Sequence, residues 1–331
     1  MYNDKVVLIT GGTGSFGRMF TETVLKDYRP KKLIVFSRDE YKQFEMSRVF
    51  AEDKYPIRYF LGDIRDKERL YRAFEGVDYV VHAAALKQVP ALEYNPFEAV
   101  KTNIVGAQNI ADAAIDRGVR CVVALSTDKA VNPVNLYGAT KLSMEKIFIA
   151  ANFYAGAHAT RFSIVRYGNV VGSRGSVIPL FARLVREGAR ELPVTDPRMT
   201  RFWITLAQGV ELVLKCTEES VGGEIFVPKI PSMRITDLIK ALCPECTHKT
   251  IGIRPGEKLH ETLVSEDEAR TTVDMGDRFV ILPQFVIKEH VIERYNDYPR
   301  PGEGFVYRSD QNDRWLTAGE LKALIEGMKF E

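Results

Sequence analysis

Tyr137 and Lys141, four positions apart, form a pair suited to acid–base chemistry. Residues at this spacing share one face of a helix, so the lysine ammonium is expected beside the phenol. A neighbouring positive charge favours the phenolate and lowers the pKa of the tyrosine toward the working range. Such a tyrosine can take a proton from an alcohol while a hydride leaves the same carbon. Thr127, at the end of the preceding predicted strand, supplies a further hydroxyl.

A glycine-rich segment at residues 10–17, which reads TGGTGSFG, predicts a site for the pyrophosphate of a dinucleotide. Glycines permit a tight turn and a close approach of the backbone to the ligand. The helix that follows presents free N–H groups and the positive end of its dipole to the phosphates. The segment lies between a strand-like run and an amphipathic run, and this context makes the motif far more specific than glycines alone.

The end of the second predicted strand indicates which dinucleotide is bound. NAD enzymes usually place an acid about 20 residues after the glycines, where it holds the ribose hydroxyls. Here Ser37 and Arg38 instead suit a 2′-phosphate, and Lys42 adds positive charge. The segment therefore favours NADP, whereas Asp39 keeps NAD open. Asp63, after the third predicted strand, is expected near the adenine or as a cap of a helix or turn.

The residues predicted to hold the dinucleotide are Gly11, Gly12, Thr13, Gly14, Ser15, Phe16, Gly17, Ser37, Arg38, Asp39, Lys42, Asp63, Ile64, Ala83, Tyr137, Lys141 and Val170.

Strand-like and helix-like runs alternate through the first half of the chain. The short apolar runs are rich in Val and Ile and lack polar alternation, as in strands buried on both faces of a parallel sheet. Strands are predicted at 5–10, 32–36, 57–61, 79–83, 121–126 and 163–167, and helices at 16–25, 67–74, 97–117 and 141–152. The alternation predicts right-handed crossovers and an α/β fold with a doubly wound parallel sheet of the Rossmann type.

Beyond about residue 168 the pattern loosens. Helices are predicted at 178–187, 206–218, 235–242 and 318–327. We expect a smaller mixed α/β lobe at the open edge of the sheet, where α/β proteins bind ligands. The predicted division is a dinucleotide-binding domain with the catalytic residues at 1–167, a substrate lobe interleaved with the sheet at 168–285, and a C-terminal extension at 286–331.

Composition excludes several classes of protein. The 331 residues are 45% hydrophobic and 27% charged, which is typical of a globular protein. The 46 basic and 44 acidic residues leave a net charge of +2, so charge gives no argument for nucleic acid or a membrane as partner. No apolar run approaches the ~18 residues of a membrane helix, and the first residues lack a signal-peptide pattern. A cytoplasmic protein is expected.

The four cysteines do not form a disulfide framework. Cys243 and Cys246 form a lone C-x-x-C, whereas a structural zinc site needs a second pair or histidines. His248 is close, but no fourth ligand is evident. We interpret the motif as a coincidence at a helix end and predict no metal.

Seven segments together resemble the extended short-chain dehydrogenase/reductase family, and within it the nucleotide-sugar 4,6-dehydratases, over nearly the whole chain. They are residues 10–17, 37–42, 82–90 (HAAALKQVP), 126–130 (STDKA), 137–141 (YGATK), 166–170 (RYGNV) and 254–258 (RPGEK). Lys129 stands where retaining relatives that act on dTDP-glucose have glutamate. Tyr137 stands where some inverting relatives have methionine. The resemblance therefore points to the inverting subgroup that acts on UDP-N-acetylglucosamine in pseudaminic-acid and flagellin-modification pathways.

The resemblance implies a role for each catalytic residue. Tyr137 takes the proton of the C4 hydroxyl while hydride passes to NADP⁺. Lys129 then takes the C5 proton as a neutral amine, which requires a depressed pKa, and Asp128 protonates the departing C6 hydroxyl, which requires a raised pKa. Hydride returns to C6, so the tightly bound cofactor is recycled. Whether Lys129 or Asp128 reprotonates C5 stays open. The predicted catalytic residues are Thr127, Asp128, Lys129, Tyr137 and Lys141.

The resemblance also places the sugar nucleotide. The implied contacts are Asn169 with the sugar or diphosphate, Ser176, Val177 and Pro179 with the uracil, Thr195 nearby, Arg201 and Arg254 with the diphosphate, Glu257 with the ribose, and Lys87 with substrate or cofactor. Lys87 is also a cation that can depress the pKa of Lys129. Guanidinium forks match phosphate oxygens, although either arginine can instead form a surface ion pair.

Alternatives to the dehydratase stay open. A nucleotide-sugar 4-epimerase or ketoreductase on the same scaffold needs Tyr137 and Lys141 but not Asp128 and Lys129, which would then form a turn and a solvated charge. A non-catalytic NADP-binding regulator is a third hypothesis. The helix at 97–117 is interpreted as core or a subunit contact, and the resemblance implies a homo-oligomer of unknown order.

Overall fold

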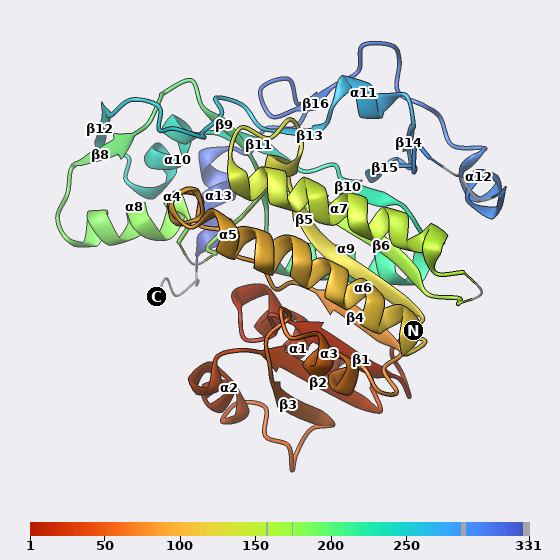
Figure 1. Cartoon of the computed structure of the whole chain (residues 1–331). Helices are drawn as coiled ribbons and strands as arrows, with labels where there is room; N and C mark the ends of the chain where they lie inside the picture. The colour runs from red at the N-terminus through yellow and green to blue at the C-terminus, as the bar shows by residue number, and fades with distance from the viewer. Residues whose placement is uncertain (157, 174, 286–288, 327–331) are drawn as a thin grey trace.

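A computed structural model of the chain describes residues 1–156, 158–173, 175–285 and 289–326. Its centre is a nine-stranded sheet in the order β14-β15-β10-β6-β5-β4-β1-β2-β3 (Figure 1). Seven strands are parallel: β1 (Val6–Thr10), β2 (Lys32–Ser37), β3 (Ile57–Leu61), β4 (Tyr79–His82), β5 (Cys121–Thr127), β6 (Arg161–Tyr167) and β10 (Ile225–Pro228). The predicted doubly wound α/β fold is confirmed.

Two antiparallel strands complete one edge of the sheet. They are β14 (Thr272–Asp274) and β15 (Arg278–Ile281), and β15 pairs with β10. All three of these strands come from the part of the chain beyond residue 168. Residues 168–285 thus divide between the main sheet and a smaller lobe, so no single cut at residue 167 separates the two.

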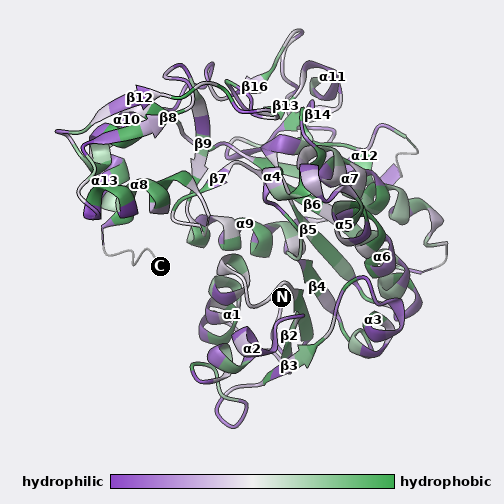
Figure 2. Ribbon diagram, turned by 60° about the vertical axis from the view of Figure 1, so that its left-hand side comes forward, coloured by the Kyte–Doolittle hydropathy of each residue, from purple (hydrophilic) through white to green (hydrophobic). Residues whose placement is uncertain are grey.

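Helices cover both faces of the sheet. The helices α3 (Lys67–Ala73), α6 (Gly106–Asp116) and α7 (Leu136–Tyr154) pack together on one face. On the other face, α1 (Ser15–Asp27) packs against α9 (Leu206–Glu219). Hydrophobic residues concentrate on β4 and β5 between these layers, and hydrophilic residues on outer elements such as α2 (Glu40–Ser47) (Figure 2). Two-sided coverage explains why these strands lack polar alternation.

The predicted helix at 97–117 is interrupted by a π-helical turn, and a side chain of this turn holds the loop that follows β4. It divides into α5 (Pro96–Ala99), a π-helical turn η1 (Val100–Val105) and α6, and α4 (Val89–Tyr94) precedes it. The π turn carries the buried Asn103, whose side chain bonds both the N–H and the C=O of Leu86 at 2.9 Å. The same amide donates to Thr140 Oγ1 at 3.0 Å. Asn103 therefore ties the loop after β4 to α7.

The smaller lobe has its own hydrophobic core, which includes Ile178, Phe181, Leu192, Trp203 and Leu238. Its elements are β7 (Asn169–Val170), α8 (Val177–Arg186), β8 (Glu191–Val194), β9 (Thr200–Ile204), β11 (Ser232–Arg234), α10 (Ile235–Leu242), β12 (Thr247–Thr250), β13 (Thr262–Val264) and α11 (Glu266–Ala269). β8 and β12 form a parallel pair, so both point their carboxyl ends the same way.

The C-terminal segment packs against this framework. It contains α12 (Glu289–Tyr295), β16 (Tyr307–Arg308) and α13 (Ala318–Ile325); the predicted end of the last helix, at 327, lies outside the described residues. β16 pairs with β13, and α13 packs on α10 with Leu321 fully buried. None of the described helices is long and apolar enough to cross a membrane.

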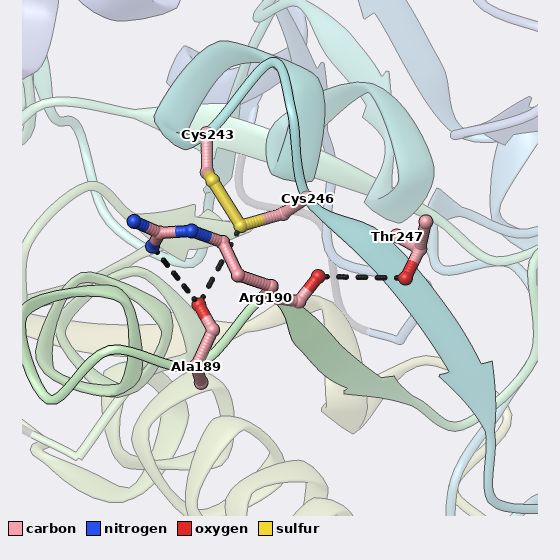
Figure 3. Close-up of a disulfide and its surroundings, with 5 residues drawn as sticks. All are labelled: Ala189, Arg190, Cys243, Cys246 and Thr247. Carbon is pink, nitrogen blue, oxygen red and sulfur yellow. Dashed lines mark hydrogen bonds between the residues drawn. A yellow bond between two sulfur atoms is a disulfide. The ribbon is translucent and has the colours of Figure 1, made fainter.

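Cys243 and Cys246 are joined in a disulfide that connects the end of α10 to the start of β12 (Figure 3). The interpretation of this C-x-x-C as a coincidence is therefore wrong. The tight turn that follows α10, in which the N–H of Cys246 donates to the carbonyl of Cys243, brings the two α-carbons to 5.3 Å, within the range that a disulfide spans. Among the described residues, no three His, Cys, Asp or Glu side chains are grouped so as to hold a metal.

Candidate active site

A cleft of about 1290 Å³ lies where the parallel strands of the sheet end and the lobe begins. All the residues predicted for the cofactor, the sugar nucleotide and catalysis line it, except Gly12 and Asp128, which are buried next to lining residues. Residues far apart in sequence, such as Ser37 at the end of β2 and Arg254 after β12, thus face one space. The topology brings them together because parallel strands end at the same edge.

The glycine-rich turn forms a cradle that side chains would fill. Gly11 has φ +66°, and a Cβ there would lie 2.8 Å from the backbone of Ala84. A Cβ on Gly17 would lie 2.3 Å from the carbonyl oxygen of Gly12, so only glycine lets α1 approach the turn this closely. Gly14 caps α1 without a side-chain hydrogen bond, and the first turn has no acid. The free N–H groups and the helix dipole fit a pyrophosphate.

The end of β2 carries two basic side chains, Arg38 and Lys42, and two carboxylates, Asp39 and Asp63, lie near them. Asp39 caps α2: its Oδ1 accepts from the N–H of Lys42 at 3.0 Å, and its Oδ2 lies 2.8 Å from Lys42 Nζ. Arg38 has only a 3.6 Å ion pair with Asp63, and its side chain is 51% exposed. Asp63 itself caps a turn, because its Oδ1 accepts from the N–H of Arg65 at 2.9 Å. In this structure the carboxylate of Asp39 is therefore engaged as the cap of α2.

The segment predicted to be catalytic is a 3-10 turn, η2 (Asp128–Ala130), at the end of β5. Thr127 caps this turn and donates from its Oγ1 to Asp128 Oδ1 at 2.9 Å. Lys129 Nζ donates to the same oxygen at 3.0 Å. Asp128 is fully buried, and its Oδ2 has no hydrogen-bond partner among the described residues. The segment is therefore not a surface turn with a solvated charge: Asp128 is fully buried, and the side chain of its partner Lys129 is 26% exposed.

Burial and neighbouring charges act differently on the two members of this pair. Burial raises the pKa of Asp128, Glu261 adds to the rise, and Lys129 opposes it without cancelling it. Burial lowers the pKa of Lys129, but the charges of Asp128 and Glu261 outweigh that effect and raise it above its ordinary value. The expected depressed pKa of Lys129 is therefore wrong for this structure, because two carboxylates face the ammonium.

Tyr137 and Lys141 lie on the first two turns of α7, whose N-cap is Asn135. Burial raises the pKa of Tyr137 to about 12, against the charge of Lys129 and a hydrogen bond with Thr127. Burial also lowers the pKa of Lys141 to about 8, and its Nζ donates to the carbonyl of Leu125 at 2.6 Å. The expected lowering of the tyrosine pKa by Lys141 is thus wrong here, because burial dominates and this lysine is bonded to the backbone.

The opposite wall of the cleft carries the predicted sugar-nucleotide residues. Asn169 Oδ1 lies 3.5 Å from Lys129 Nζ, which joins the two parts of the cleft. Ser176 Oγ, just before α8, and Glu257 Oε2 are buried polar atoms without a hydrogen-bond partner among the described residues. The side chain of Arg254 is 57% exposed, and its Nη1 lies 3.8 Å from Glu257 Oε1. Unsatisfied buried acceptors and an exposed guanidinium are the groups that a polar ligand would pair with.

The remaining predicted contacts also lie on this cleft, at the start of α8, after β8 and after β4. They are Val177, Pro179, Thr195 and Lys87.

Arg201 does not fit the predicted diphosphate clamp. It is buried, and its guanidinium donates to the carbonyls of Thr200 at 2.7 Å, Leu259 at 3.0 Å and Lys258 at 3.0 Å. Its Nε lies 3.6 Å from Glu261 Oε1. Since its donors are already directed at protein atoms, Arg201 holds the chain at 258–261 in place.

Among the cleft residues to which sequence reasoning gave no role are two charged ones near the Asp128–Lys129 pair, Lys258 and Glu261. Glu261 Oε1 lies 3.5 Å from Lys129 Nζ, and Lys258 Nζ donates to the carbonyl of Val131 at 2.5 Å. Both contact the catalytic turn from more than a hundred positions away in sequence. The only signal was the motif at 254–258, which ends three residues before Glu261.

Comparison with known proteins agrees with this architecture. A family model described as "Polysaccharide biosynthesis protein" matches residues 7–283. The chain is 54% identical to the UDP-N-acetylglucosamine 4,6-dehydratase (inverting) of Campylobacter jejuni subsp. jejuni serotype O:2, with 98% of each chain aligned. It is 41% identical to a protein of Rickettsia canadensis named UDP-glucose 4-epimerase, over 100% of this chain and 98% of the relative.

Solved structures show the same fold. The X-ray structure of Pen from Bacillus thuringiensis superposes with a TM-score of 0.89 at 41% identity, covering 98% of both chains. DesIV, a dTDP-glucose 4,6-dehydratase from Streptomyces venezuelae, is 22% identical, covers 90% of this chain and 93% of its own, and has a TM-score of 0.66. The resemblance to nucleotide-sugar dehydratases of the short-chain dehydrogenase/reductase type is confirmed. The chain belongs to the polysaccharide biosynthesis protein family whose model spans residues 7–283.

Proposed function

We propose that this protein is an NADP-dependent hydro-lyase, a UDP-N-acetylglucosamine 4,6-dehydratase that inverts C5. Its product would be UDP-2-acetamido-2,6-dideoxy-β-L-arabino-hexos-4-ulose, for pseudaminic-acid synthesis and flagellin glycosylation. The observation that carries the proposal is the Asp128–Lys129 pair at the cleft, in which the aspartate is buried and its Oδ1 lies 3.0 Å from the lysine Nζ. An epimerase needs no such pair. The 54% identity to a relative of that name supports the same substrate.

Oxidation at C4 requires a base for the hydroxyl proton. Bound NADP would supply the hydride acceptor and return the hydride to C6. Tyr137 is the base, and its hydrogen bond with Thr127 and the charge of Lys129 both favour its phenolate. Lys141 lies one turn further along α7 and its pKa of about 8 lets it exchange a proton near neutral pH.

Elimination requires a base at C5 and an acid at C6. The ion pair contains both in latent form, because one proton moved from Lys129 Nζ to Asp128 Oδ1 gives a neutral amine and a neutral carboxylic acid. The two atoms are already in hydrogen-bond contact at 3.0 Å. The raised pKa of Asp128 favours this transfer, whereas the raised pKa of Lys129 opposes it, so substrate must bind before the proton moves fully. The amine then takes the C5 proton, and the acid protonates the departing C6 hydroxyl.

The dinucleotide is proposed to be NADP, held by the turn at 11–17 and by Ser37 and Arg38. Ser37 Oγ accepts from Gln43 at 3.0 Å, so its own hydroxyl proton is directed elsewhere and available to a phosphate. Asp39 is occupied as the cap of α2. The remaining residues predicted for this ligand lie on the same cleft.

We also propose a homo-oligomer that forms through the helices near residues 94–117. Tyr94 on α4 and Phe97 on α5 are 87% and 72% exposed, which is unusual for large aromatic side chains.

A second candidate, a 4-epimerase, is favoured by the 41% identity to the Rickettsia relative. It would use Tyr137 and leave Asp128 and Lys129 without a chemical role.

Incubation with UDP-N-acetylglucosamine in deuterated water, without added cofactor, separates the two candidates. Proton NMR and mass spectrometry of a dehydratase reaction should show loss of one water, a 4-keto-6-methyl sugar with inverted C5, and deuterium at C5. Unchanged mass with the galacto isomer would establish the epimerase. No conversion, even with NADP⁺ supplied, would contradict the proposed substrate.

A further inference from the structure

We infer that Glu261 is a positioning residue of the catalytic pair, an anion anchored by Arg201 that keeps a proton on the Asp128–Lys129 pair. This inference rests on the proposed function for its chemical meaning. It assigns to Arg201 a role inside the protein in place of the diphosphate contact that the family resemblance implied.

Geometry gives Glu261 access to the pair. Its side chain is 3% exposed, and one oxygen, Oε1, lies 3.5 Å from Lys129 Nζ and 3.6 Å from Arg201 Nε. The other oxygen, Oε2, is buried without a hydrogen-bond partner among the described residues. The residue lines the cleft. A buried carboxylate that bridges a partly buried lysine and a buried arginine is paired on both sides, as a buried charge must be.

The surrounding framework fixes this carboxylate in place. The N–H of Glu261 donates to Ser309 Oγ at 2.9 Å, and the N–H of Ser309 donates to the carbonyl of Glu261 at 2.9 Å. Arg201 is fixed by the three carbonyls that its guanidinium bonds. Two strands, β9 and β13, therefore hold the carboxylate against a turn that begins at the end of β5. Sites supported by such packed elements keep their geometry.

The charged groups that face the pair decide what Glu261 does. They are Asp128 and Lys129 on η2, Tyr137 on α7, Arg201 on β9, Lys258 on the loop before β13, and Glu261 itself. His260, the preceding residue, faces Thr200 and Asp310 instead. Burial would raise the pKa of Glu261, but Lys129, Arg201 and Lys258 lower it below its ordinary value, so it is ionised.

An ionised Glu261 raises the pKa of Asp128 and of Lys129 alike. It therefore does not choose between the acid and the base. Its effect is that the Asp128–Lys129 pair keeps its shared proton up to a higher pH than it would without Glu261. Since that proton becomes the one given to the C6 hydroxyl, a pair that has lost it cannot complete the elimination.

The test is the alkaline limb of the pH profile in Glu261→Gln, a neutral side chain of the same shape. Removal of an anion within about 4 Å of the pair should move the limb of kcat/KM to lower pH by about one unit. Glu261→Asp, which keeps the charge, should move it less. The matched control is Asp267→Asn, which removes an exposed charge (86% of its side chain accessible) on the same lobe and should leave the profile unchanged. An unshifted limb in a folded Glu261→Gln protein would overturn the inference.

A second measurement does not depend on turnover. The ¹³Cε signal of Lys129 in lysine-labelled protein, identified by its loss in Lys129→Ala, reports the titration of that amine directly. Its midpoint should fall in Glu261→Gln, or in Glu261→Asp to a smaller extent if the glutamine variant does not fold. An unchanged midpoint contradicts the inference. If the wild-type protein does not dehydrate the sugar nucleotide, the proposed function fails while this titration still decides the role of Glu261.

Discussion

At the scale of single residues, one shared proton explains how an aspartate and a lysine adjacent in sequence can serve as acid and base. Asp128 and Lys129 share a hydrogen bond of 3.0 Å, and the pKa of both is raised. The demands that elimination makes on the two groups are opposite, but a single proton transfer between them meets both. Their adjacency in sequence is therefore what the chemistry uses.

Removing the base separates the two half-reactions. Lys129→Ala should reduce dehydration by at least about 100-fold, since general base catalysis contributes 10²–10⁴-fold. Exchange of hydride at C4 should persist, because Tyr137 is untouched. Mass spectrometry with C4-deuterated substrate measures both. Lys240→Ala, at an exposed lysine of α10, is the control that should keep full activity. Full dehydration by Lys129→Ala would show that the base is another residue.

Arg38 should decide cofactor preference. Arg38→Ala removes the guanidinium proposed to meet the 2′-phosphate and should weaken NADP binding more than 10-fold, since a charge-assisted bond contributes about 1.5–3 kcal/mol. NAD binding, which lacks that phosphate, should change little. Calorimetric titration of both dinucleotides measures this. Arg58→Ala, at an arginine 57% exposed on β3, should alter neither affinity. Equal weakening of NADP and NAD would show that Arg38 does not read the phosphate.

At the scale of elements, the junction of the glycine-rich turn with α1 sets the cradle for the pyrophosphate. Gly17→Ala places a Cβ 2.3 Å from a backbone oxygen of the turn, so α1 must move away. Dinucleotide binding, followed by calorimetry, should be lost. Gly319→Ala in α13 is the matched control: nothing lies within 4 Å of the added atom, and alanine should stabilise that helix by up to about 1 kcal/mol. Unchanged binding in Gly17→Ala would refute the cradle.

The disulfide joins two elements that reach the cleft indirectly. β12 begins just after Cys246 and leads to the loop at 254–258, while its partner β8 leads to Thr195. The disulfide closes a short loop, so it constrains the unfolded chain little. Removing it in a Cys243→Ser, Cys246→Ser variant should lower the free energy of unfolding by at most about 2 kcal/mol. Urea denaturation measures this cost. A larger loss would mean that the lobe core depends on the crosslink.

At the scale of the whole molecule, a buried ion cluster ties the sheet to the lobe. Arg166 on β6 is fully buried and bonds Glu145 on α7 and Glu268 on α11. Its Nη2 lies 2.6 Å from Glu145 Oε2 and 2.9 Å from Glu268 Oε1. The N–H of Ser265 also donates to Glu268. The cluster connects three segments that are far apart in sequence, so its loss affects the molecule as a unit.

Stability should depend on pH through this cluster. Burial would raise the pKa of Glu268, but the charge and hydrogen bonds of Arg166 lower it below the 4.5 of a free glutamate. A depressed folded-state pKa gives stability that is fully present above pH 4.5 and is lost as pH falls through the folded value. Urea unfolding from pH 7 to pH 3.5 should show this loss, and Glu268→Gln should reduce the slope. The Asp267→Asn control should keep the wild-type slope; a wild-type slope in Glu268→Gln would contradict the assignment.

The sequence was most informative where one local pattern determines the structure. The strands β1 to β6 and the helices α1 and α7 follow from apolar runs and amphipathic periods, and only their ends differ by a few residues. The strands β14 and β15 were not predicted, because strands of three or four residues carry little periodic signal. The π turn η1 was also not predicted; it carries Asn103, whose hydrogen bonds with Leu86 in another segment exist only in the folded chain.

The sequence by itself determined which residue types stand at the strand ends: the glycine turn, the Asp128–Lys129 pair, and Tyr137 with Lys141. Only the tertiary structure decided their electrostatic state. The pKa of Lys129 depends on Glu261, more than a hundred residues away, and the donors of Arg201 are directed at carbonyls of the segment beside it. Local patterns report what a side chain can do, whereas burial and distant charges, which exist only after folding, determine what it does.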